Sequence, residues 1–354
     1  MTAPPNGYHR PMDRERLTIV IAAFNEADSL PMLQPRIGAV LDTLACDGVD
    51  GQVLYVDDGS RDATWQVMQQ LAAADRRIAL LRLSRNFGKE LALTAGLDRV
   101  ENGAAALILD ADGQDAPELI PQFVARWREG YDDVYGTRLE REGEGVVKRV
   151  TAHAFYRVIG ALSKTPIPAD TGDFRLLSPR ALHALQQLRE RHRFMKGLFG
   201  WVGFNRIAIP YHRNPRNAGR TKFNFWRLWN LALEGITSFS TAPLRLATYL
   251  GLLTALVAFV YGMAIIVKAL LWGDPVAGWP TMMVVILFLG GVQLIALGLI
   301  GEYLGRLYDE AKQRPLYLVD TWQPAAAGVS SAQEQPADGG AHAHGTSTAG
   351  GQAG

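Results

Sequence analysis

Two long uncharged stretches constrain the fold of this 354-residue chain more than any other feature. Residues 247–267 and 281–301 contain no Asp, Glu, Lys or Arg. As helices, each would span roughly 31 Å, which matches the hydrocarbon thickness of a bilayer. Buried helices of a soluble protein are the alternative, but such helices usually keep a polar face and these stretches have none. The sequence therefore predicts a two-helix transmembrane region within residues 246–304.

Basic residues around these stretches predict their orientation. Arg245 precedes the first stretch, and Arg306, Lys312 and Arg314 follow the second. Because Lys and Arg collect on the cytoplasmic side of membrane helices, both termini and the region before the first stretch are expected in the cytoplasm. Residues 224–245 contain tryptophans among apolar residues and are expected to form a juxtamembrane amphipathic helix in the membrane interface.

Composition narrows the class of protein and its partners. The formal net charge is only +1, so no nucleic-acid partner is expected. Cys46 is the only cysteine, which fits a reducing cytosolic setting. Residues 1–16 form a polar N-terminal tail without the apolar core of a signal peptide. Residues 305–322 are expected to be a cytoplasmic post-membrane segment, and the Ala-, Gly- and Gln-rich residues 323–354 a disordered tail.

The region 17–223 alternates short apolar runs with stretches of helical periodicity. Such alternation predicts an α/β domain with a mostly parallel sheet and right-handed crossovers. No Gly-x-Gly-x-x-Gly turn follows the first run and no Walker loop is present, which excludes a dinucleotide fold and a P-loop enzyme. The predicted strands are 17–23, 52–56, 78–83, 104–109 and 134–138.

Polar side chains gather directly after three of these predicted strands. In open α/β sheets, ligands bind outside the carboxyl ends of the strands. Carboxylates crowded there repel each other unless a cation lies between them, and Mg²⁺ or Mn²⁺ with a diphosphate would serve. Helix capping is the alternative for Asn25, Asp112 and Asp115, which precede predicted helices. The residues that follow the strands are Asn25, Glu26, Asp57, Asp58, Asp110, Asp112 and Gln114.

Two further groups of charged residues follow in the chain. Asp173 and Arg175 are two residues apart in an extended segment and share one side of it, so an ion pair between them is the structural alternative to a functional role. Arg213, Arg216 and Lys222 lie in a glycine-containing segment before the membrane region. Clustered cations there suit capture of a phosphate, and attraction to anionic lipid headgroups is the alternative.

Several of these motifs together resemble a known family. The chain is similar to the polyprenyl-phosphate glycosyltransferases of glycosyltransferase family 2, which have the GT-A fold, and in particular to bactoprenol glucosyltransferases and dolichol-phosphate mannose synthase. The resemblance covers roughly residues 17–320. The stretches that carry it are FNE (24–26), VDDGSRDAT (56–64), LSRNFGKELALTAGLD (83–98), DADGQD (110–115), DTGDFRLLS (170–178), RFMKGLFGWVGF (193–204) and NAGRTKFNFWRLWN (217–230).

The resemblance implies a role for each candidate residue. Asp110, Asp112 and Gln114 would surround a divalent cation, Mg²⁺ or Mn²⁺, at the diphosphate. The catalytic residues would be Asp112 and Asp173, the latter beside the reacting sugar. The nucleotide-sugar site would comprise Asn25, Glu26, Asp57, Asp58 and Asp110. The lipid phosphate and diphosphate would be bound by Arg138, Arg149, Arg213, Arg216 and Lys222.

The function implied is inverting, metal-dependent transfer of a hexose to undecaprenyl phosphate at the cytoplasmic face of a bacterial inner membrane. UDP-glucose is the expected donor, and UDP-N-acetylhexosamine, UDP-galactose or GDP-mannose are the alternatives. The family also implies a homotetramer. A processive polysaccharide synthase would need more spans than two, and a non-catalytic membrane scaffold would not need the intact acidic residues.

Overall fold

The computed structural model describes residues 15–138, 171–191, 193–211, 242–272 and 278–326. In chain order the elements are β1 (Glu15–Ala23), α1 (Leu30–Cys46), β2 (Val49–Asp57), α2 (Thr64–Ala74), β3 (Ile78–Leu83), α3 (Lys89–Leu97), β4 (Ala105–Ile108), the 3₁₀ helix η1 (Pro117–Leu119), α4 (Ile120–Arg128), β5 (Asp133–Arg138), β6 (Thr171–Leu177), α6 (Pro179–Gln187), α7 (Met195–Val202), β7 (Arg206–Tyr211), α9 (Ala242–Trp272), α10 (Trp279–Ala311) and β8 (Val319–Gln323).

The described strands form one sheet in the order β7-β5-β6-β4-β1-β2-β3-β8. β1 pairs in parallel with both β2 and β4, β2 with β3, and β5 with β7. β6 runs antiparallel to its neighbours β4 and β5, and β8 runs antiparallel to β3. The prediction of a mostly parallel α/β sheet is therefore confirmed, and the five predicted strands are all present, with ends that differ from the predicted ones by at most three residues.

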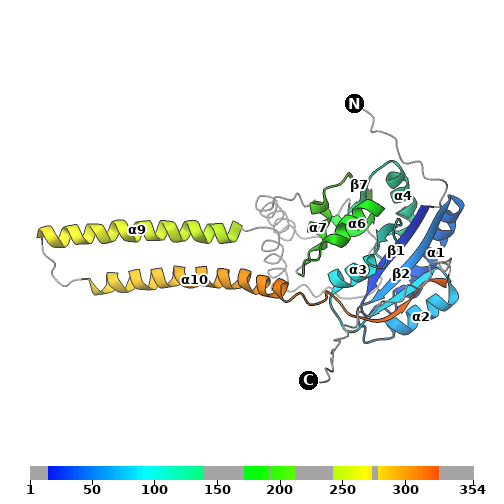
Figure 1. The fold of residues 1–354 in the computed structure, drawn as a ribbon, viewed down its shortest axis with the longest axis horizontal. Coiled ribbons are helices and arrows are strands. Elements are labelled where there is room, and N and C mark those ends of the chain that lie inside the picture. The colour runs from blue at the N-terminus through cyan, green and yellow to red at the C-terminus, as the bar shows by residue number, and fades with distance from the viewer. Residues whose placement is uncertain (1–14, 139–170, 192, 212–241, 273–277, 327–354) are drawn as a thin grey trace, which may run out of the picture.

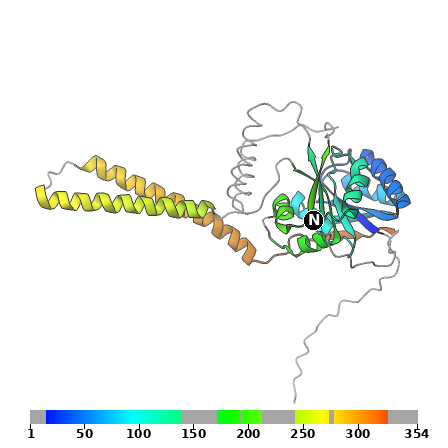
Figure 2. The same cartoon turned by 90° about the horizontal axis from the view of Figure 1, so that it is seen from above.

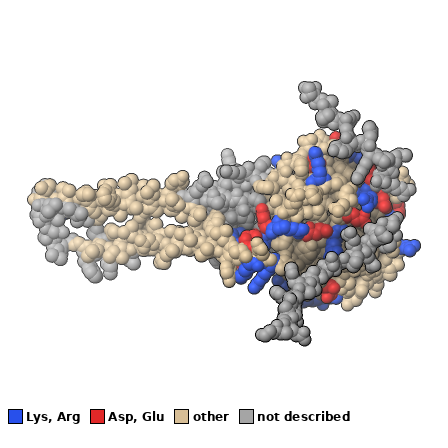
Figure 3. Space-filling view, viewed as in Figure 1, with Lys and Arg blue, Asp and Glu red and all other residues tan. Residues whose placement is uncertain are grey.

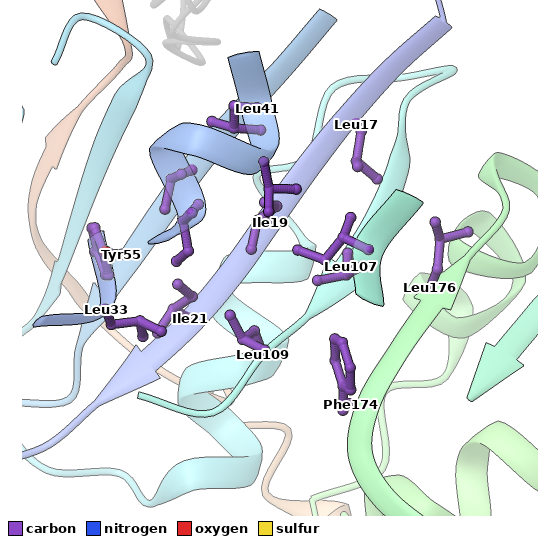
Figure 4. Close-up of a cluster of buried hydrophobic side chains, with 14 of the residues drawn as sticks. Leu17, Ile19, Ile21, Leu33, Leu41, Tyr55, Leu107, Leu109, Phe174 and Leu176 are labelled. Carbon is purple, nitrogen blue, oxygen red and sulfur yellow. The ribbon is translucent and has the colours of Figure 1, made fainter. Parts of the chain in front are cut away.

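The central strands are buried on both faces, which explains their nearly continuous apolar sequence. Leu17, Ile19 and Ile21 of β1 pack on one face of the sheet with α1, α2 and α4, whereas Val20 packs on the other face with α3, α6 and α7. Figure 4 shows the first of these clusters, where Phe174 of β6 joins the side chains of β1. Two helical layers therefore enclose the sheet and hold the ends of its strands in place (Figure 1).

The helix faces follow the same logic. In α1 the buried apolar residues recur every three or four positions, as expected of a helix with one side on a sheet. They are Leu30, Leu33, Ile37, Val40, Leu41 and Leu44. On the other face α3 approaches the sheet so closely that a Cβ on Gly96 would lie 2.5 Å from a methyl group of Val20. The glycine is needed there to let α3 pack against β1.

α9 and α10 form a hairpin that projects from the domain (Figures 1 and 2). Both helices contain a segment long and apolar enough to cross a membrane, at Ala247–Ala264 and Phe288–Ala311. These segments are not buried in the protein, and Ile295 for example is 73% exposed. The charged side chains visible in Figure 3 lie on the globular domain and at the base of the hairpin. An exposed apolar hairpin of this kind has the surface expected of a helix pair in a bilayer.

After the hairpin the chain returns to the domain and adds a strand to the sheet. β8 pairs with β3 at the sheet edge, and Arg99 lies over the Trp322 ring at 5.2 Å. No strand is predicted from the sequence in 305–322, and the predicted disordered tail starts at Gln323. Gln323 is instead the last residue of β8, and Ala325 is buried against the core, so the packed chain extends beyond that boundary.

Some predicted segments lie outside the described residues. They include the N-terminal tail to residue 14, the basic residues Arg149, Arg213, Arg216 and Lys222, and most of the predicted tail. Of the juxtamembrane segment 224–245, only the last four residues are described, and they belong to α9.

Candidate active site at the carboxyl ends of the strands

Four of the predicted site residues line one cleft of ≈ 460 Å³ at the carboxyl ends of β1, β2 and β4. They are Glu26, Asp58, Asp110 and Asp112. The cleft is also lined by Asn86, Gly88 and Lys89 from the β3–α3 connection. A larger cleft of ≈ 620 Å³ lies elsewhere, between Asp98 and the chain after α10, and holds none of the predicted residues. The acidic strand ends therefore converge, as the sheet topology predicts.

Asp58 shapes the wall of the cleft through its hydrogen bonds. Its two carboxylate oxygens accept the backbone N–H groups of Phe87 (2.7 Å) and Gly88 (2.9 Å). Burial raises the pKa of Asp58, and these two hydrogen bonds oppose that rise. Gly59 allows the turn, because its φ is +66° and a Cβ there would lie 2.6 Å from the backbone of Arg85. Asp58 thus positions the loop that leads to Lys89.

Asp57 contributes differently from its neighbour. Its side chain is fully buried, accepts the backbone N–H of Ser60 (2.9 Å) and forms an ion pair with Arg82 (3.3 Å). It does not line the cleft. The structure therefore places Asp57 behind the cleft wall, where it supports the turn that carries Asp58.

Asn25 does not cap a helix, contrary to the alternative drawn from the sequence. The N-cap of α1 is Ser29, whose hydroxyl donates to Glu26 Oε2 (2.6 Å). Asn25 has a positive φ of 58°, and its side-chain oxygen accepts the Arg61 N–H (2.9 Å). Asn25 therefore ties the end of β1 to the loop after β2. A short polar residue is one of the few that tolerate this left-handed conformation.

The segment after β4 also lacks the predicted capping. The residues that precede η1 and α4 are Ala116 and Leu119, and neither makes a side-chain capping bond. Asp112 instead accepts the backbone N–H of Gln114 (3.1 Å), and Asp115 accepts the hydroxyl of Tyr211 (2.5 Å). Asp112 remains at the cleft. Gln114 is 6% exposed and is not among the cleft-lining residues.

A lysine that the sequence analysis did not single out joins two of the predicted residues. Lys89 Nζ lies 2.6 Å from Asp110 and 2.5 Å from Asp173. Burial disfavours the charge on Lys89, but the two carboxylates outweigh it and raise its pKa. Burial would likewise raise the pKa of Asp173, but Lys89 and then Lys196 lower it. Asp173 is therefore held as a carboxylate next to the cleft.

A signal for Lys89 was present in the sequence. Lys89 is the first residue of α3, and a cation at a helix N-terminus is unfavourable because the macrodipole is positive there. A lysine at this position is therefore favoured by nearby carboxylates, and Asp110 after β4 and Asp173 in β6 supply them.

Arg175 does not pair with Asp173, which excludes the ion pair considered as the structural alternative. The Arg175 guanidinium pairs with Asp133 of β5 at 3.1 Å, and both side chains are almost fully buried. The guanidinium also lies over the Phe199 ring of α7, at 3.7 Å from the ring centroid, and over the Tyr135 ring of β5 at 5.8 Å. Arg138 ends β5 beside Tyr211 of β7, as its backbone pairing shows. The other predicted cations lie outside the described residues.

Comparison with known proteins decides the family. The model of "Glycosyl transferase family 2" matches residues 18–185, and that of the "GtrB C-terminal hairpin" matches residues 242–307. A glycosyltransferase of Synechocystis, described as uncharacterized, is 50% identical over 86% of this chain and 95% of its own length. The chain belongs to glycosyltransferase family 2.

Two further comparisons concern named activities. The bactoprenol glucosyl transferase of Shigella phage SfX is 44% identical to this family-2 glycosyltransferase, over 86% of this chain and 98% of the relative. Among solved structures, a mannosyltransferase of Pyrobaculum calidifontis in complex with GDP-Man and Mn²⁺ is 17% identical, with a TM-score of 0.39 over 87% of this chain and 91% of that one.

The donor set of the cleft fits the divalent cation that the resemblance implies. Asp110 and Asp112 offer hard oxygen ligands on one wall, and the contact of Asp110 with the Lys89 ammonium shows that this carboxylate accommodates a positive charge. Within the described residues no group of three or more His, Cys, Asp or Glu is arranged around a metal site. Mg²⁺ commonly takes one or two carboxylates and completes its shell with phosphate oxygens and water, so two are sufficient.

Proposed function

We propose that this family-2 glycosyltransferase transfers a hexose from a nucleotide sugar to a polyprenyl phosphate. Glucose from UDP-glucose and undecaprenyl phosphate are the proposed substrates. The observation that carries the proposal is the convergence of Asp58, Asp110, Asp112 and the Lys89–Asp173 pair on one cleft, in a domain attached to an apolar hairpin. The name of the phage relative, a bactoprenol glucosyl transferase, supports the same acceptor and sugar.

The proposed reaction is a single displacement with inversion. An oxygen of the acceptor phosphate forms a bond to the anomeric carbon while the bond from that carbon to the diphosphate breaks, and the electron pair leaves with the diphosphate. The acceptor phosphate is anionic near neutral pH, so the site needs no strong base. Rate enhancement then depends on positioning and on stabilisation of developing charge.

The residues of the cleft have distinct proposed roles. Glu26, Asp58 and Asp110 border the nucleotide sugar, and Asn25 and Asp57 hold the loops that carry them. Asp173, kept ionised by Lys89, is proposed to orient the substrates or to stabilise positive charge at the anomeric carbon; its contact with the cleft-lining Lys89 supports this role. When bound by Asp110 and Asp112, Mg²⁺ or Mn²⁺ would offset the negative charge of the diphosphate. Gln114 as a third ligand, and Arg138, Arg149, Arg213, Arg216 and Lys222 as phosphate-binding residues, remain part of the proposal.

The hairpin explains why such an enzyme needs a membrane region. A polyprenyl phosphate stays in the bilayer, so the cleft must be held beside it. We propose the bacterial inner membrane, with the α/β domain and both termini in the cytoplasm, and a homotetramer in which hairpins of neighbouring subunits pack together. Proteoliposomes probed with a protease from outside test the orientation, and mass photometry in detergent tests the tetramer.

The test of the reaction is an assay with the purified full-length protein in detergent. It contains undecaprenyl phosphate, Mg²⁺ or Mn²⁺, and in parallel radiolabelled UDP-glucose, UDP-N-acetylglucosamine, UDP-galactose or GDP-mannose. Lipid-soluble label from UDP-glucose, lost on addition of a chelator, supports the proposal. Label from another donor alone would change the sugar and keep the reaction. Absence of transfer from every donor would contradict the enzyme proposal and favour a membrane scaffold.

Asp112→Asn tests the cleft within the same assay. The substitution keeps the shape of the side chain but removes its charge, so transfer should fall by roughly a hundredfold or more if Asp112 helps to hold the cation at the reaction centre. Thermal unfolding should stay close to that of the wild type. Glu118→Gln, at the exposed pair with Arg36, is the matched control and should keep full activity. Near-normal transfer by the Asp112→Asn variant would refute this role.

A further inference from the structure

Glu90 is an acidic residue beside the proposed reaction centre to which the proposed mechanism assigns no role. It is the second residue of α3 and follows Lys89 directly. Its Oε2 accepts the backbone N–H of Met195, the first residue of α7, at 3.3 Å. The Glu90 carboxylate therefore connects the turn that carries Lys89 with the N-terminus of a second helix.

The charged groups around Glu90 belong to the reaction centre and its borders. Lys89 of α3 and Lys196 of α7 favour the ionised form of Glu90, whereas Asp173 of β6 disfavours it. The charge of Glu90 also favours the protonated form of Arg193, which precedes α7. Lys89, Lys196, Glu90 and Asp173 thus form one charged cluster, in which both lysines also lower the pKa of Asp173.

α7 is held against the strand that carries Asp173. Phe199, one turn further along α7, packs on the guanidinium of Arg175, which is two residues from Asp173 in β6. A carboxylate is favoured at a helix N-terminus, where the macrodipole and the first N–H groups are positive. The ionised Glu90 therefore holds the start of α7, and with it Lys196, toward Asp173.

We propose that Glu90 is a positioning residue whose ionisation draws the N-terminus of α7 onto the active site and so places Lys196 beside Asp173. The inference depends on the proposed glycosyl transfer at Asp173. With Glu90 ionised, the cluster holds two cations, Lys89 and Lys196, whose charges both act on Asp173. With Glu90 protonated, the attraction to both lysines is lost and α7 is held less firmly, so the positioning of the substrates deteriorates.

The expected working range follows from the surroundings of Glu90. Burial, together with the charge of Asp173, raises the pKa of Glu90 to about 7. Glu90 is then largely protonated below this pH and largely ionised above it. Transfer should therefore fall as the pH drops through about 7, although Asp173 itself stays ionised far below that pH because its own pKa is lowered.

The experiment compares pH profiles of kcat/KM for the full-length wild type and two variants, Glu90→Gln and Glu90→Asp. Glu90→Gln is neutral at every pH, so its rate above pH 7 should fall by roughly tenfold to a hundredfold, the scale of a misplaced reacting group. The fall in its rate on the acid side should move down to about pH 6, where the acceptor phosphate dianion takes up a proton to become the monoanion. Glu90→Asp keeps a titratable carboxyl, so its acid limb should stay near neutral pH, with partial recovery of the rate.

The outcomes separate this inference from the proposed function. Glu118→Gln serves as a distant control and should reproduce the wild-type profile. An acid limb that stays near pH 7 in Glu90→Gln would overturn the role of Glu90, and so would loss of that limb in Glu90→Asp. Failure of the wild type to transfer any sugar would instead refute the proposed function. If Glu90→Gln does not fold, the Glu90→Asp profile decides: because Asp ordinarily ionises about 0.4 pH units below Glu, the fall in rate should begin slightly lower in pH than in the wild type, and an unchanged position would overturn the role of Glu90.

Discussion

Replacement of Lys89 by Met removes an ammonium group that contacts both Asp110 and Asp173. Methionine keeps most of the length and apolar stem of lysine but carries no charge. Because the two carboxylate oxygens lie 2.6 Å and 2.5 Å from the same nitrogen, they are no more than about 5 Å apart. Without Lys89, two negative charges face each other across this short distance.

The magnitude follows from Coulomb's law and the exposure of the site. Two unit charges about 5 Å apart repel by about 3 kcal/mol at an effective dielectric constant of about 20. The Lys89 side chain is 44% exposed, so water reaches the site and reduces this value. We expect the Lys89→Met variant to lose about 1–3 kcal/mol of folding stability at pH 8, or roughly 2–10 °C in the unfolding midpoint.

The stability difference between Lys89→Met and the wild type should depend on pH in one direction. Asp173 has a lowered pKa in the wild type, so the stability that its charge contributes is present near neutral pH and is lost only well below its ordinary value. In Lys89→Met the two carboxylates disfavour each other's ionisation, so the folded state takes up a proton as the pH falls. The stability difference between the variant and the wild type should therefore shrink between about pH 8 and pH 5.

The assay is thermal unfolding of the full-length protein in detergent across this pH range. Lys89→Arg should stay close to the wild type, because it retains the charge. Lys312→Met is a matched control, since the contacts of Lys312 are local to the end of α10: a long ion pair with Asp309 at 4.0 Å and the Tyr308 ring at 3.9 Å. Equal midpoints for Lys89→Met and the wild type at pH 8, or a difference that grows as the pH falls, would refute the reasoning.

Two further substitutions test how the site is built. Arg175→Met leaves the buried Asp133 carboxylate without its ion-pair partner and should lower the folding stability by about 3 kcal/mol or more, measured by thermal unfolding. The control is Arg189→Met, at a pair whose arginine is 54% exposed, which should lower the stability by less than about 1 kcal/mol. Similar losses of stability in both variants would contradict this account. Gly59→Ala forces a side chain into a positive φ with a Cβ 2.6 Å from backbone atoms, so it should destabilise by about 1–3 kcal/mol and weaken donor binding, whereas Gly130→Ala, also at positive φ but in open space, should cost less.

Much of the sheet was predictable because its strands are buried on both faces. Runs such as LTIVIAA, with Thr18 as its one polar residue, and LIL are almost wholly apolar, which distinguishes them from loops without any knowledge of the fold. β8 escaped prediction for the opposite reason. Its sequence, VDTWQ, mixes polar and apolar residues, and it lies at the sheet edge, where only one side of the strand is paired. Its pairing depends on the position of the hairpin, which local sequence does not encode.

The acidic strand ends were predicted as a group, but their individual roles required coordinates. Asp57 and Asp58 are adjacent in sequence, yet alternation along the strand directs one behind the cleft wall and the other into it. Asn25 is of a residue type typical of helix N-caps, but its side chain instead accepts a hydrogen bond from the backbone of the loop after β2. Lys89 was not predicted for the same reason, because the carboxylates that it contacts at the cleft are 21 and 84 residues away in the chain.

The direction of β8 brings the apolar hairpin close to the end of the sheet that holds the cleft. β8 is antiparallel to β3, so its first residue, Val319, pairs with Leu83 at the carboxyl end of β3. The Ser84 N–H donates to the Leu318 carbonyl at 3.0 Å, directly before the loop that leads to Lys89. The chain leaving α10 therefore joins the sheet at the carboxyl end of β3, the same end of the strands at which the cleft lies. A parallel β8 would start at the opposite ends of the strands and would bring the hairpin there, so the cleft would lie away from the proposed lipid acceptor. The direction of this one strand therefore decides which end of the sheet lies near the hairpin.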